Sequence, residues 1–212
     1  MLWGAHNGGL ELRRNRDGSV NLRGRFPYGE AATLSDGGRS GRPRKERIAP
    51  RAFAHRVEDP DAEIHLLVGH DFDHPLASKL TETLELRDRD DALTFEAMIG
   101  AAIADTQHGR DALALIGAGL AVGLSPGFRI PPERAVPDAE EIEEEPDDGT
   151  EDENGQPRRG ALIRTIKAAL LFELSIVTRA AYQNATVEAR RWSPDQKAGT
   201  GPMVHPLYRW RA

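Results

Sequence analysis

The feature that most constrains the fold is a run of acidic residues in the second half of the chain. Residues 138–153 hold eleven carboxylates and no Lys or Arg, and residues 131–160 contain five of the fourteen prolines. Like charges at this density favour an open chain, and prolines interrupt helices and strands. We therefore expect no core from this segment and interpret it as a disordered acidic insert at about residues 131–160.

The same run accounts for the sign of the net charge. The chain has 28 Lys and Arg against 34 Asp and Glu, a formal net charge of −6. Outside residues 138–153 the 28 basic residues face only 23 acidic ones, which leaves +5. The basic cluster at residues 39–47 has no aromatic side chains between its cations, so we do not expect nucleic-acid binding.

Length and composition exclude several classes of protein. A chain of 212 residues can form one domain or two small ones. It has no cysteine, which excludes a disulfide scaffold, a thiol nucleophile and a thiolate metal site. The first residues lack the pattern of a signal peptide, and the longest uncharged stretch, 112–128, is shorter than the roughly 20 residues that a membrane helix needs. We expect a soluble protein with no membrane partner.

The hydrophobic pattern predicts several strands and one good helix. Alternation indicates strands at 19–26, 62–70, 121–130 and 161–177, and a hairpin of 80–86 with 92–99. The helix spans 105–120, capped by Asp105 or Thr106; a shorter one lies around 50–57, and 27–47 is predicted to be a long loop. This combination is typical of a mainly β or α+β domain.

The first candidate for chemistry is Ser125, in the sequence Gly-Leu-Ser-Pro-Gly of residues 123–127. Flanking glycines let the backbone turn closely and expose amide groups near the hydroxyl, and the pattern matches the G-x-S-x-G elbow of α/β-hydrolases. That elbow must lead into a helix, which Pro126, Pro131 and Pro132 forbid. The alternative is a serine in a glycine-bounded turn.

The second candidate is His70, which ends an apolar strand. A partly desolvated imidazole there could act as a general base. A metal site built with His65, His74 and the nearby Asp71 and Asp73 is a second interpretation, but His65 and His70 would point to opposite faces of one strand. A third interpretation is that His70 is an ordinary loop histidine without a catalytic or metal-binding role.

The third candidate is Glu173, which interrupts the apolar run of residues 170–177. Burying this carboxylate without a partner would cost several kcal/mol. It must lie at an edge, or pair with an imidazole or with one of three arginines: Arg129, Arg164 or Arg179.

Taken in order, these blocks resemble the HK97-type phage prohead (capsid maturation) serine proteases, relatives of the herpesvirus assemblins. The resemblance runs from about Leu22 to about Val187. It is carried by four blocks, Arg-Ile-Ala-Pro-Arg-Ala-Phe at 47–53, Leu-Leu-Val-Gly-His-Asp at 66–71, Gly-Leu-Ala-Val-Gly-Leu-Ser-Pro-Gly-Phe at 119–128 and Phe-Glu-Leu-Ser-Ile-Val-Thr at 172–178. The last block departs from the family, because Arg179-Ala180-Ala181 stands where a Pro-Ala pair is usual.

The resemblance implies a closed β-barrel wrapped by a few helices and a serine endopeptidase with a Ser-His-Glu triad. Ser125 would be the nucleophile, His70 the base and Glu173 the third member, with no metal and no cofactor. Backbone amides at Gly127 and Phe128 would stabilise the oxyanion, and Arg129 would assist there or bind substrate. The protease domain would span 21–187, between a flexible N-terminus, 1–20, and a polar C-terminal tail, 188–212.

The resemblance also implies a partner and a place. The enzyme would act in the host cytoplasm, inside the assembling prohead, on the scaffolding segment of the major capsid protein and on itself, at the tail from Arg190 or in the acidic loop. We also expect a homodimer. Two alternatives stay open: a non-catalytic capsid-assembly factor that docks through the acidic segment, and a metal-dependent hydrolase using the region of His65, His70 and His74.

Overall fold

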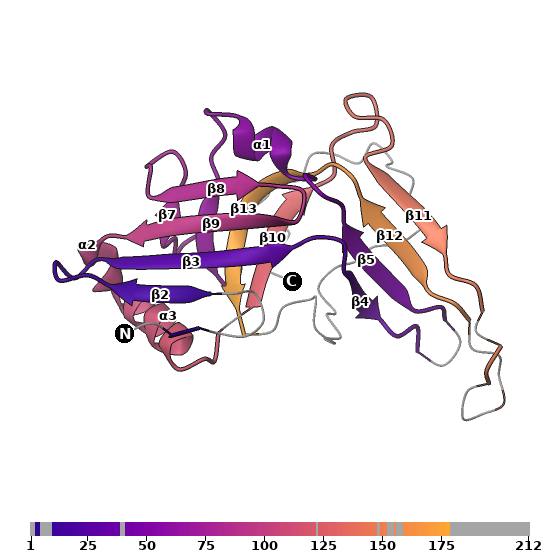
Figure 1. Cartoon of the computed structure of the whole chain (residues 1–212), viewed down its shortest axis with the longest axis horizontal. Coiled ribbons are helices and arrows are strands. Elements are labelled where there is room, and N and C mark those ends of the chain that lie inside the picture. Colours follow the sequence, from indigo (N-terminus) through magenta and orange to yellow (C-terminus); the bar gives the residue numbers. More distant parts are fainter. Residues whose placement is uncertain are drawn as a thin grey trace.

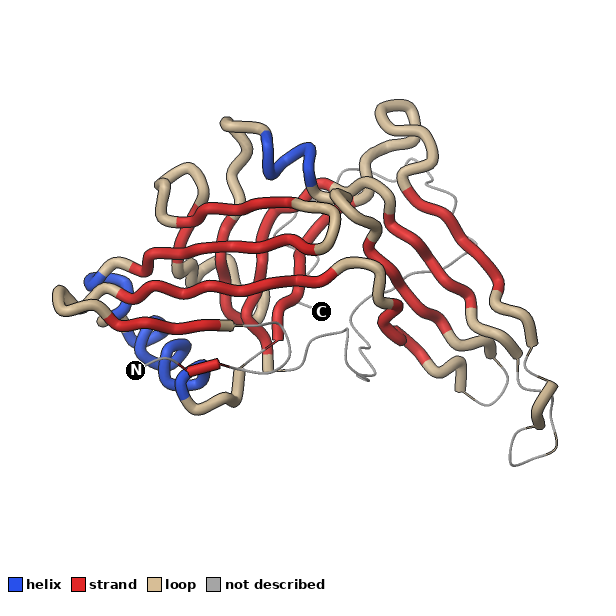
Figure 2. The backbone as a smooth tube through the Cα atoms, viewed as in Figure 1, coloured by secondary structure: helices blue, strands red, loops and turns tan. Residues whose placement is uncertain are grey.

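The computed structural model describes residues 3–4, 10–38, 41–121, 123–147, 149–151, 155 and 159–178. These residues form three β-sheets and three helices (Figures 1 and 2). Two of the sheets build the main body, and the third extends from it to one side, at the right of Figure 1.

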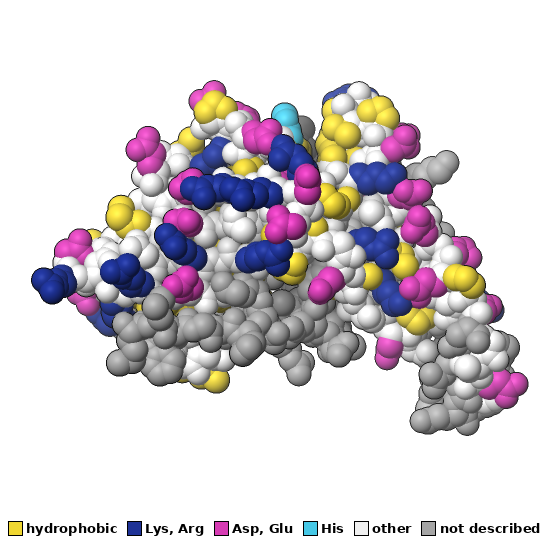
Figure 3. Space-filling model, viewed as in Figure 1, with side chains coloured by type: hydrophobic (Ala, Val, Ile, Leu, Met, Phe, Trp, Pro, Cys, Tyr) yellow, Lys and Arg dark blue, Asp and Glu magenta, His cyan; other side chains and the backbone are white. Residues whose placement is uncertain are grey.

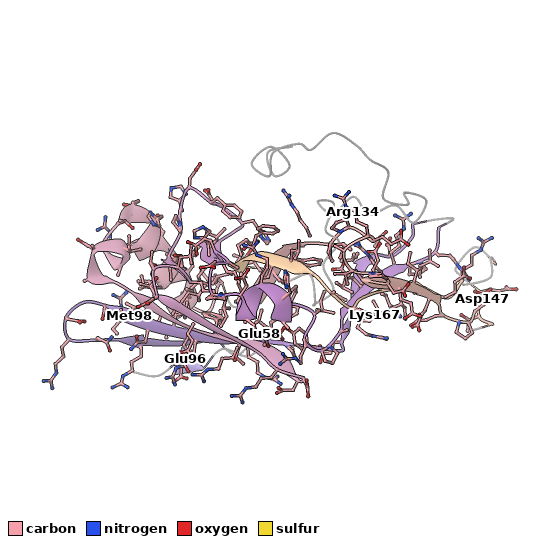
Figure 4. The ribbon with its side chains drawn as sticks, turned by 90° about the horizontal axis from the view of Figure 1, so that it is seen from above. Glu58, Glu96, Met98, Arg134, Asp147 and Lys167 are labelled. Carbon is pink, nitrogen blue, oxygen red and sulfur yellow. The ribbon has the colours of Figure 1, made fainter. Side chains whose placement is uncertain are left out.

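The first sheet is antiparallel throughout. Its strands, in order, are β1 (Trp3–Gly4), β2 (Glu11–Arg14), β3 (Val20–Pro27), β9 (Ala92–Ile99) and β8 (Leu84–Asp88). Buried and more exposed residues alternate along β3 and β8, so one face packs on the core and the other meets solvent. Figure 4 shows Glu96 and Met98 of β9 on the solvent side. The predicted strand at 19–26 and the predicted hairpin are thus confirmed.

The second sheet carries the candidate residues. Its strands, in order, are β10 (Gly123–Arg129), β13 (Leu170–Val177), β6 (His65–Val68) and β7 (Ala77–Ser78). β13 is antiparallel to β10 and parallel to β6. Strand β10 is buried on both parities from Gly123 to Gly127, so both faces of this sheet are covered there.

The third sheet has the order β11 (Glu140–Glu144), β12 (Leu162–Ile166), β5 (Arg44–Ile48) and β4 (Ala31–Ser35). Two of its strands, β4 and β5, fall in the segment 27–47 that we predicted to be a loop. The predicted strand at 161–177 is in fact two strands, β12 and β13, which belong to different sheets.

The core lies between the first two sheets, whose strands cross in Figure 1. Leu22 and Phe95 contribute from the first sheet, and Leu66, Leu174 and Ile176 from the second. The helices are α1 (Ala54–Glu58), α2 (Ala101–Ala104) and α3 (Gln107–Gly117). The predicted helix at 105–120 is α3, and Thr106 caps it by accepting a hydrogen bond from the backbone N–H of Gly109.

Two segments distant in sequence run side by side through both the second and the third sheets. β5 is parallel to β12 in the third sheet, and β6 is parallel to β13 in the second. Between the sheets, Ala49 donates its N–H to Ile166 at 2.9 Å and Ala169 donates to Ala52 at 2.7 Å. The two segments therefore run parallel in two successive ladders, with α1 inserted between β5 and β6 in the first segment, and His70 lies just beyond the end of the second ladder.

The closed barrel that the resemblance implied is not found. A barrel needs a hydrogen-bonded ladder at every edge. Within the described residues all three sheets are open, and no ladder joins an edge of the first sheet, β1 or β8, to an edge of the second, β10 or β7. The strands of these two sheets cross instead, and the molecule is mainly β with three helices in the described part.

Parts of the acidic insert and of the N-terminal segment form strands, which the sequence does not predict. Glu140–Glu144 form β11, antiparallel to β12, although every residue of this strand is exposed, so the insert contributes no core there. In the segment 1–20, β2 pairs with β3, and Leu10 and Leu12 enter the core. The predicted tail, 188–212, lies outside the described residues.

Basic residues from elsewhere in the chain explain why the acidic strand forms. Arg164 Nε donates to Glu140 Oε2 at 2.7 Å, and Lys45 Nζ lies 2.8 Å from both carboxylate oxygens of Glu145. Arg42 pairs with Glu144, and Lys167 Nζ lies 2.6 Å from Glu141 Oε2. Figure 3 shows basic and acidic side chains side by side on this sheet, and Figure 4 places Lys167 near the body and Asp147 towards the sheet's outer end. The repulsion that favours an open chain is thereby offset.

Low pH is expected to weaken the ion pairs between the acidic insert and the basic residues of the third sheet. Hydrogen bonding from Lys45 lowers the pKa of Glu145, and the backbone N–H of Gly160 together with Arg42 lowers the pKa of Asp147. A carboxylate with a lowered folded-state pKa stabilises the fold above its unfolded pKa and loses that contribution as pH falls through the folded value. We expect Glu145→Gln to reduce the free energy of unfolding by about 0.5 kcal/mol at pH 7. In urea denaturation this gap from the wild type should narrow as the pH falls below the ordinary titration range of a glutamate, because the folded-state pKa of Glu145 lies below that range. A gap of equal size at neutral and at acid pH would contradict the assignment.

One further expectation concerns membranes. Within the described ranges no helix has both the length and the apolar character needed to span a bilayer.

Candidate active site

Ser125 lies within strand β10 and not in a turn. It faces Ser175 of β13 across the antiparallel ladder and is 7 % exposed. β10 is the edge strand of its sheet in the described part of the chain, which suits Pro126, a residue without an N–H for a second ladder. Both the hydrolase elbow and the glycine-bounded turn are therefore wrong, because the chain stays extended through Arg129.

Glu173 lies on β13 opposite Gly127 and is 1 % exposed. A Cβ atom built on Gly127 would lie 1.8 Å from Glu173 Oε1, so the carboxylate rests where the side chain of any other residue would be. This contact also fixes the face of the sheet. The side-chain direction at position 127 leads to the carboxylate, and Ser125, two residues away on the same strand, shares that direction. Ser125 and Glu173 therefore occupy the same face.

His70 follows β6 in a turn that returns its side chain to this face. The N–H of Gly69 still bonds to the carbonyl of Ile176 at 3.0 Å, which continues the pairing of β6 with β13. Gly69 and His70 then adopt left-handed backbone angles, with φ of 60° and 64°. This conformation is rare for a residue with a side chain, and such outliers concentrate at functional sites.

The two side chains meet there: His70 Nδ1 lies 2.7 Å from Glu173 Oε1. The imidazole is 24 % exposed, whereas the carboxylate is almost fully buried, at 2 %. A carboxylate bonded to Nδ1 holds the proton on that nitrogen, which leaves Nε2 able to accept another. Among the partners that we considered for Glu173, the structure therefore selects the imidazole; Arg164 pairs instead with Glu46 and Glu140.

A second serine completes the surroundings of the carboxylate. Ser175 donates its hydroxyl to Glu173 Oε2 at 2.7 Å. Ser175 was not among the predicted site residues, although its place two positions after Glu173 in the extended run puts both side chains on one face.

The structure does not join the serine to the base. No hydrogen bond links Ser125 to His70 within the described residues, although both lie on the face that carries Glu173. In enzymes without substrate this bond is often long and forms only in the complex. The arrangement thus places a hydroxyl on the sheet face that also carries a paired imidazole and buried carboxylate. These are the types of group that acyl transfer needs.

Three neighbouring residues were predicted to stabilise the oxyanion or bind substrate. Gly127 makes room for the carboxylate. The ring of Phe128 packs 5.7 Å from that of Phe53, and it is partly buried against the core. Arg129 is exposed, with its guanidinium 5.3 Å from the centre of the Phe172 ring. Their roles towards an oxyanion or substrate stay predictions.

The histidines of the metal interpretation lie in different surroundings. His74 Nδ1 pairs with Asp71 at 2.7 Å on the exposed side, and the ring of His65 lies edge-on to Phe72. In the part of the chain that the structure describes, no group of three or more His, Asp or Glu side chains could hold a metal ion. The metal-dependent hydrolase therefore gains no support from the geometry.

Comparison with protein-family models matches residues 37–198 to the caudovirus prohead serine proteases. The chain belongs to this family. The family establishes a serine protease of bacteriophage capsid maturation, as the resemblance of the sequence blocks implied. Searches of curated proteins and of solved structures found no match. The match spans all three residues of the site, and each lies in a segment that the structure describes.

Proposed function

We propose that this prohead protease cuts peptide bonds with a triad of Ser125, His70 and Glu173. The observation that carries the proposal is the 2.7 Å contact between His70 Nδ1 and Glu173 Oε1, made on the sheet face to which Ser125 also belongs. A carboxylate as buried as Glu173 is costly unless hydrogen bonds and a charge partner compensate for its desolvation. An imidazole that becomes protonated during the reaction provides that partner.

The reaction proceeds in two acyl-transfer steps. Ser125 Oγ attacks the carbonyl carbon while His70 Nε2 takes its proton, so an O–C bond forms and the carbonyl oxygen becomes negative. The intermediate then collapses: the C–N bond breaks, and His70 returns the proton to the leaving amine. Water, activated by the same imidazole, releases the acyl group from Ser125. Glu173 holds the imidazole tautomer and stabilises its protonated form throughout.

Stabilisation of the oxyanion is assigned to the backbone N–H groups of Gly127 and Phe128. Pro126 cannot contribute, because it has no N–H. The register of β10 against β13 shifts between Gly127 and Phe128, so the backbone direction changes immediately after the nucleophile. Arg129, on the exposed part of the same strand, is assigned to substrate binding.

The substrate that we propose is the scaffolding segment of the major capsid protein, cut inside the assembling prohead in the host cytoplasm. Self-cleavage and a homodimer are part of this proposal. Of the two predicted self-cleavage regions, the tail from Arg190 lies outside the described residues, and the acidic loop is partly occupied by β11. Proteases cut accessible, irregular segments most readily, so within the loop we place the site outside β11.

Co-expression of the protease with its capsid protein, followed by intact-mass analysis, tests this function. We expect the capsid protein to lose its scaffolding segment and the protease to release fragments of its own. An uncut capsid protein beside a protease that reacts with a fluorophosphonate at Ser125 would show a serine hydrolase with another substrate.

A non-catalytic assembly factor is the second candidate. It needs the fold and the acidic segment but has no use for a buried carboxylate bonded to an imidazole. Unchanged capsid-protein mass in the presence of the wild-type protein, together with normal assembly in the presence of a Ser125→Ala variant, would favour it.

A further inference from the structure

Ser175 carries a buried hydroxyl beside the catalytic pair to which the proposed mechanism gives no role. Ser175 is fully buried and faces Ser125 across the ladder between β10 and β13. It therefore lies between the nucleophile's strand and the turn that carries His70. Two questions follow: which of the two serines, Ser125 or Ser175, attacks the substrate, and what the other serine does.

The hydrogen bonds of Ser175 answer the first question. Its Oγ accepts the backbone N–H of His70 at 2.9 Å and donates to Glu173 Oε2 at 2.7 Å. A hydroxyl has a single proton to donate, and here that proton is directed to a carboxylate and not to an imidazole. Ser175 is thus engaged with the base's backbone and with the acid's second oxygen, and Ser125 is the serine left for attack.

The same two bonds answer the second question. His70 lies in a left-handed turn, a conformation that the surrounding structure must hold in place. The bond from its N–H to Ser175 ties that turn to β13, and the bond to Oε2 leaves Oε1 directed at Nδ1. One hydroxyl therefore fixes the two groups whose distance defines the catalytic pair.

We infer that Ser175 is a positioning residue, which sets the geometry of the His70–Glu173 pair without touching the substrate. This inference rests on the proposed triad. Removing the hydroxyl would leave a backbone N–H and a carboxylate oxygen unsatisfied in a buried place, and the pair would relax away from its 2.7 Å contact.

The rate of covalent labelling by a small alkyl fluorophosphonate tests the inference with the full-length protein. In this reaction the Ser125 Oγ–P bond forms, the P–F bond breaks, fluoride leaves and His70 takes the proton. Because the reagent is small, its saturation constant reports binding and its limiting rate reports activation of the serine. We expect Ser175→Ala to lower the limiting rate about 10- to 100-fold, with an unchanged saturation constant.

Ser78→Ala is the matched control. Ser78 is a buried strand serine of the same sheet, with hydrogen bonds to Glu63 and Thr81 and none to the catalytic pair. We expect it to be labelled at the wild-type rate. A rate loss in Ser78→Ala as large as in Ser175→Ala would overturn the inference, because general loosening of the sheet would then explain both.

The outcomes separate this inference from the proposed function. Labelling that fails in the wild type, or that maps to Ser175 by peptide mass spectrometry, would overturn the triad and the inference together. Labelling of Ser175→Ala at the wild-type rate would overturn the inference alone. If Ser175→Ala does not fold, the near-isosteric Ser175→Cys decides: its thiol bonds weakly, so a folded variant with a slowed limiting rate supports positioning, and one with the wild-type rate refutes it.

Discussion

Ser125→Ala is expected to abolish cleavage of the capsid protein, with a loss of about 10⁶-fold in kcat. The variant has no hydroxyl to form the acyl-enzyme, and the other serine on this face, Ser175, directs its proton to Glu173. His70→Ala should cost as much, since members of a triad act as a unit. Glu173→Gln should lose about 10⁴-fold and keep a residual rate, because the amide preserves the shape of the carboxylate but not its charge. Intact-mass analysis of timed cleavage reactions would measure all three.

His74→Ala provides the control for His70→Ala. His74 Nδ1 also lies 2.7 Å from a carboxylate, that of Asp71, but both side chains are about half exposed. An exposed pair of this kind contributes little, so cleavage should proceed at the wild-type rate. A loss in His74→Ala equal to that in His70→Ala, together with sensitivity to chelators, would instead favour the metal-dependent hydrolase. Cleavage that survives Ser125→Ala would refute the assignment of the nucleophile.

Gly127→Ala is expected to reduce kcat about 100-fold without altering the chemistry of any triad residue. The new Cβ would lie 1.8 Å from Glu173 Oε1 and 2.6 Å from its Cδ, so the carboxylate must move. Displacing a catalytic group by about 1 Å can cost that much in rate. The position of Glu173 beside His70 does not itself bind peptide, so KM should change little. Steady-state cleavage of a peptide spanning the capsid-protein site would separate the two constants.

Gly117→Ala is the control for this substitution. Gly117 lies in the last turn of α3, and a Cβ there would meet no atom within 4 Å. Alanine also favours a helix over glycine, so the variant should cleave normally and be at least as stable as the wild type. If Gly127→Ala retained wild-type kcat, the backbone would have yielded instead of the carboxylate, and the tight contact would not be a condition of catalysis.

The sequence predicts best those strands in which buried and solvent-exposed side chains alternate. Alternation along β3 and β9 reflects one buried face and one wet face, which a period of two reveals directly. β5 and β11 escape this reasoning because their side chains are charged. Lys45 and Glu145 are one hundred positions apart, so nothing in either segment indicates the partner that stabilises the strand.

Some features of the candidate site can be predicted from a single segment of the sequence, and others depend on how distant strands pair. The unusual place of Glu173 in an apolar run predicts a buried carboxylate in need of a partner, and His70 meets that need. The register that sets Ser125 opposite Ser175 and Glu173 opposite Gly127 depends on how β10 meets β13 across the insert. Without this register, neither the role of Ser175 nor the requirement for glycine at position 127 could be predicted from the sequence.

The parallel pairing of β5 with β12 and of β6 with β13 has a consequence for the order in which the protein forms during synthesis. About one hundred residues separate the two strands of each pair, and parallel pairing over such a separation forms slowly and late. During synthesis His70 and Ser125 emerge well before β13, which carries both Glu173 and Ser175. If these residues form the triad that we propose, we expect proteolytic activity to begin only after β13, the last strand in the described part of the chain, has docked.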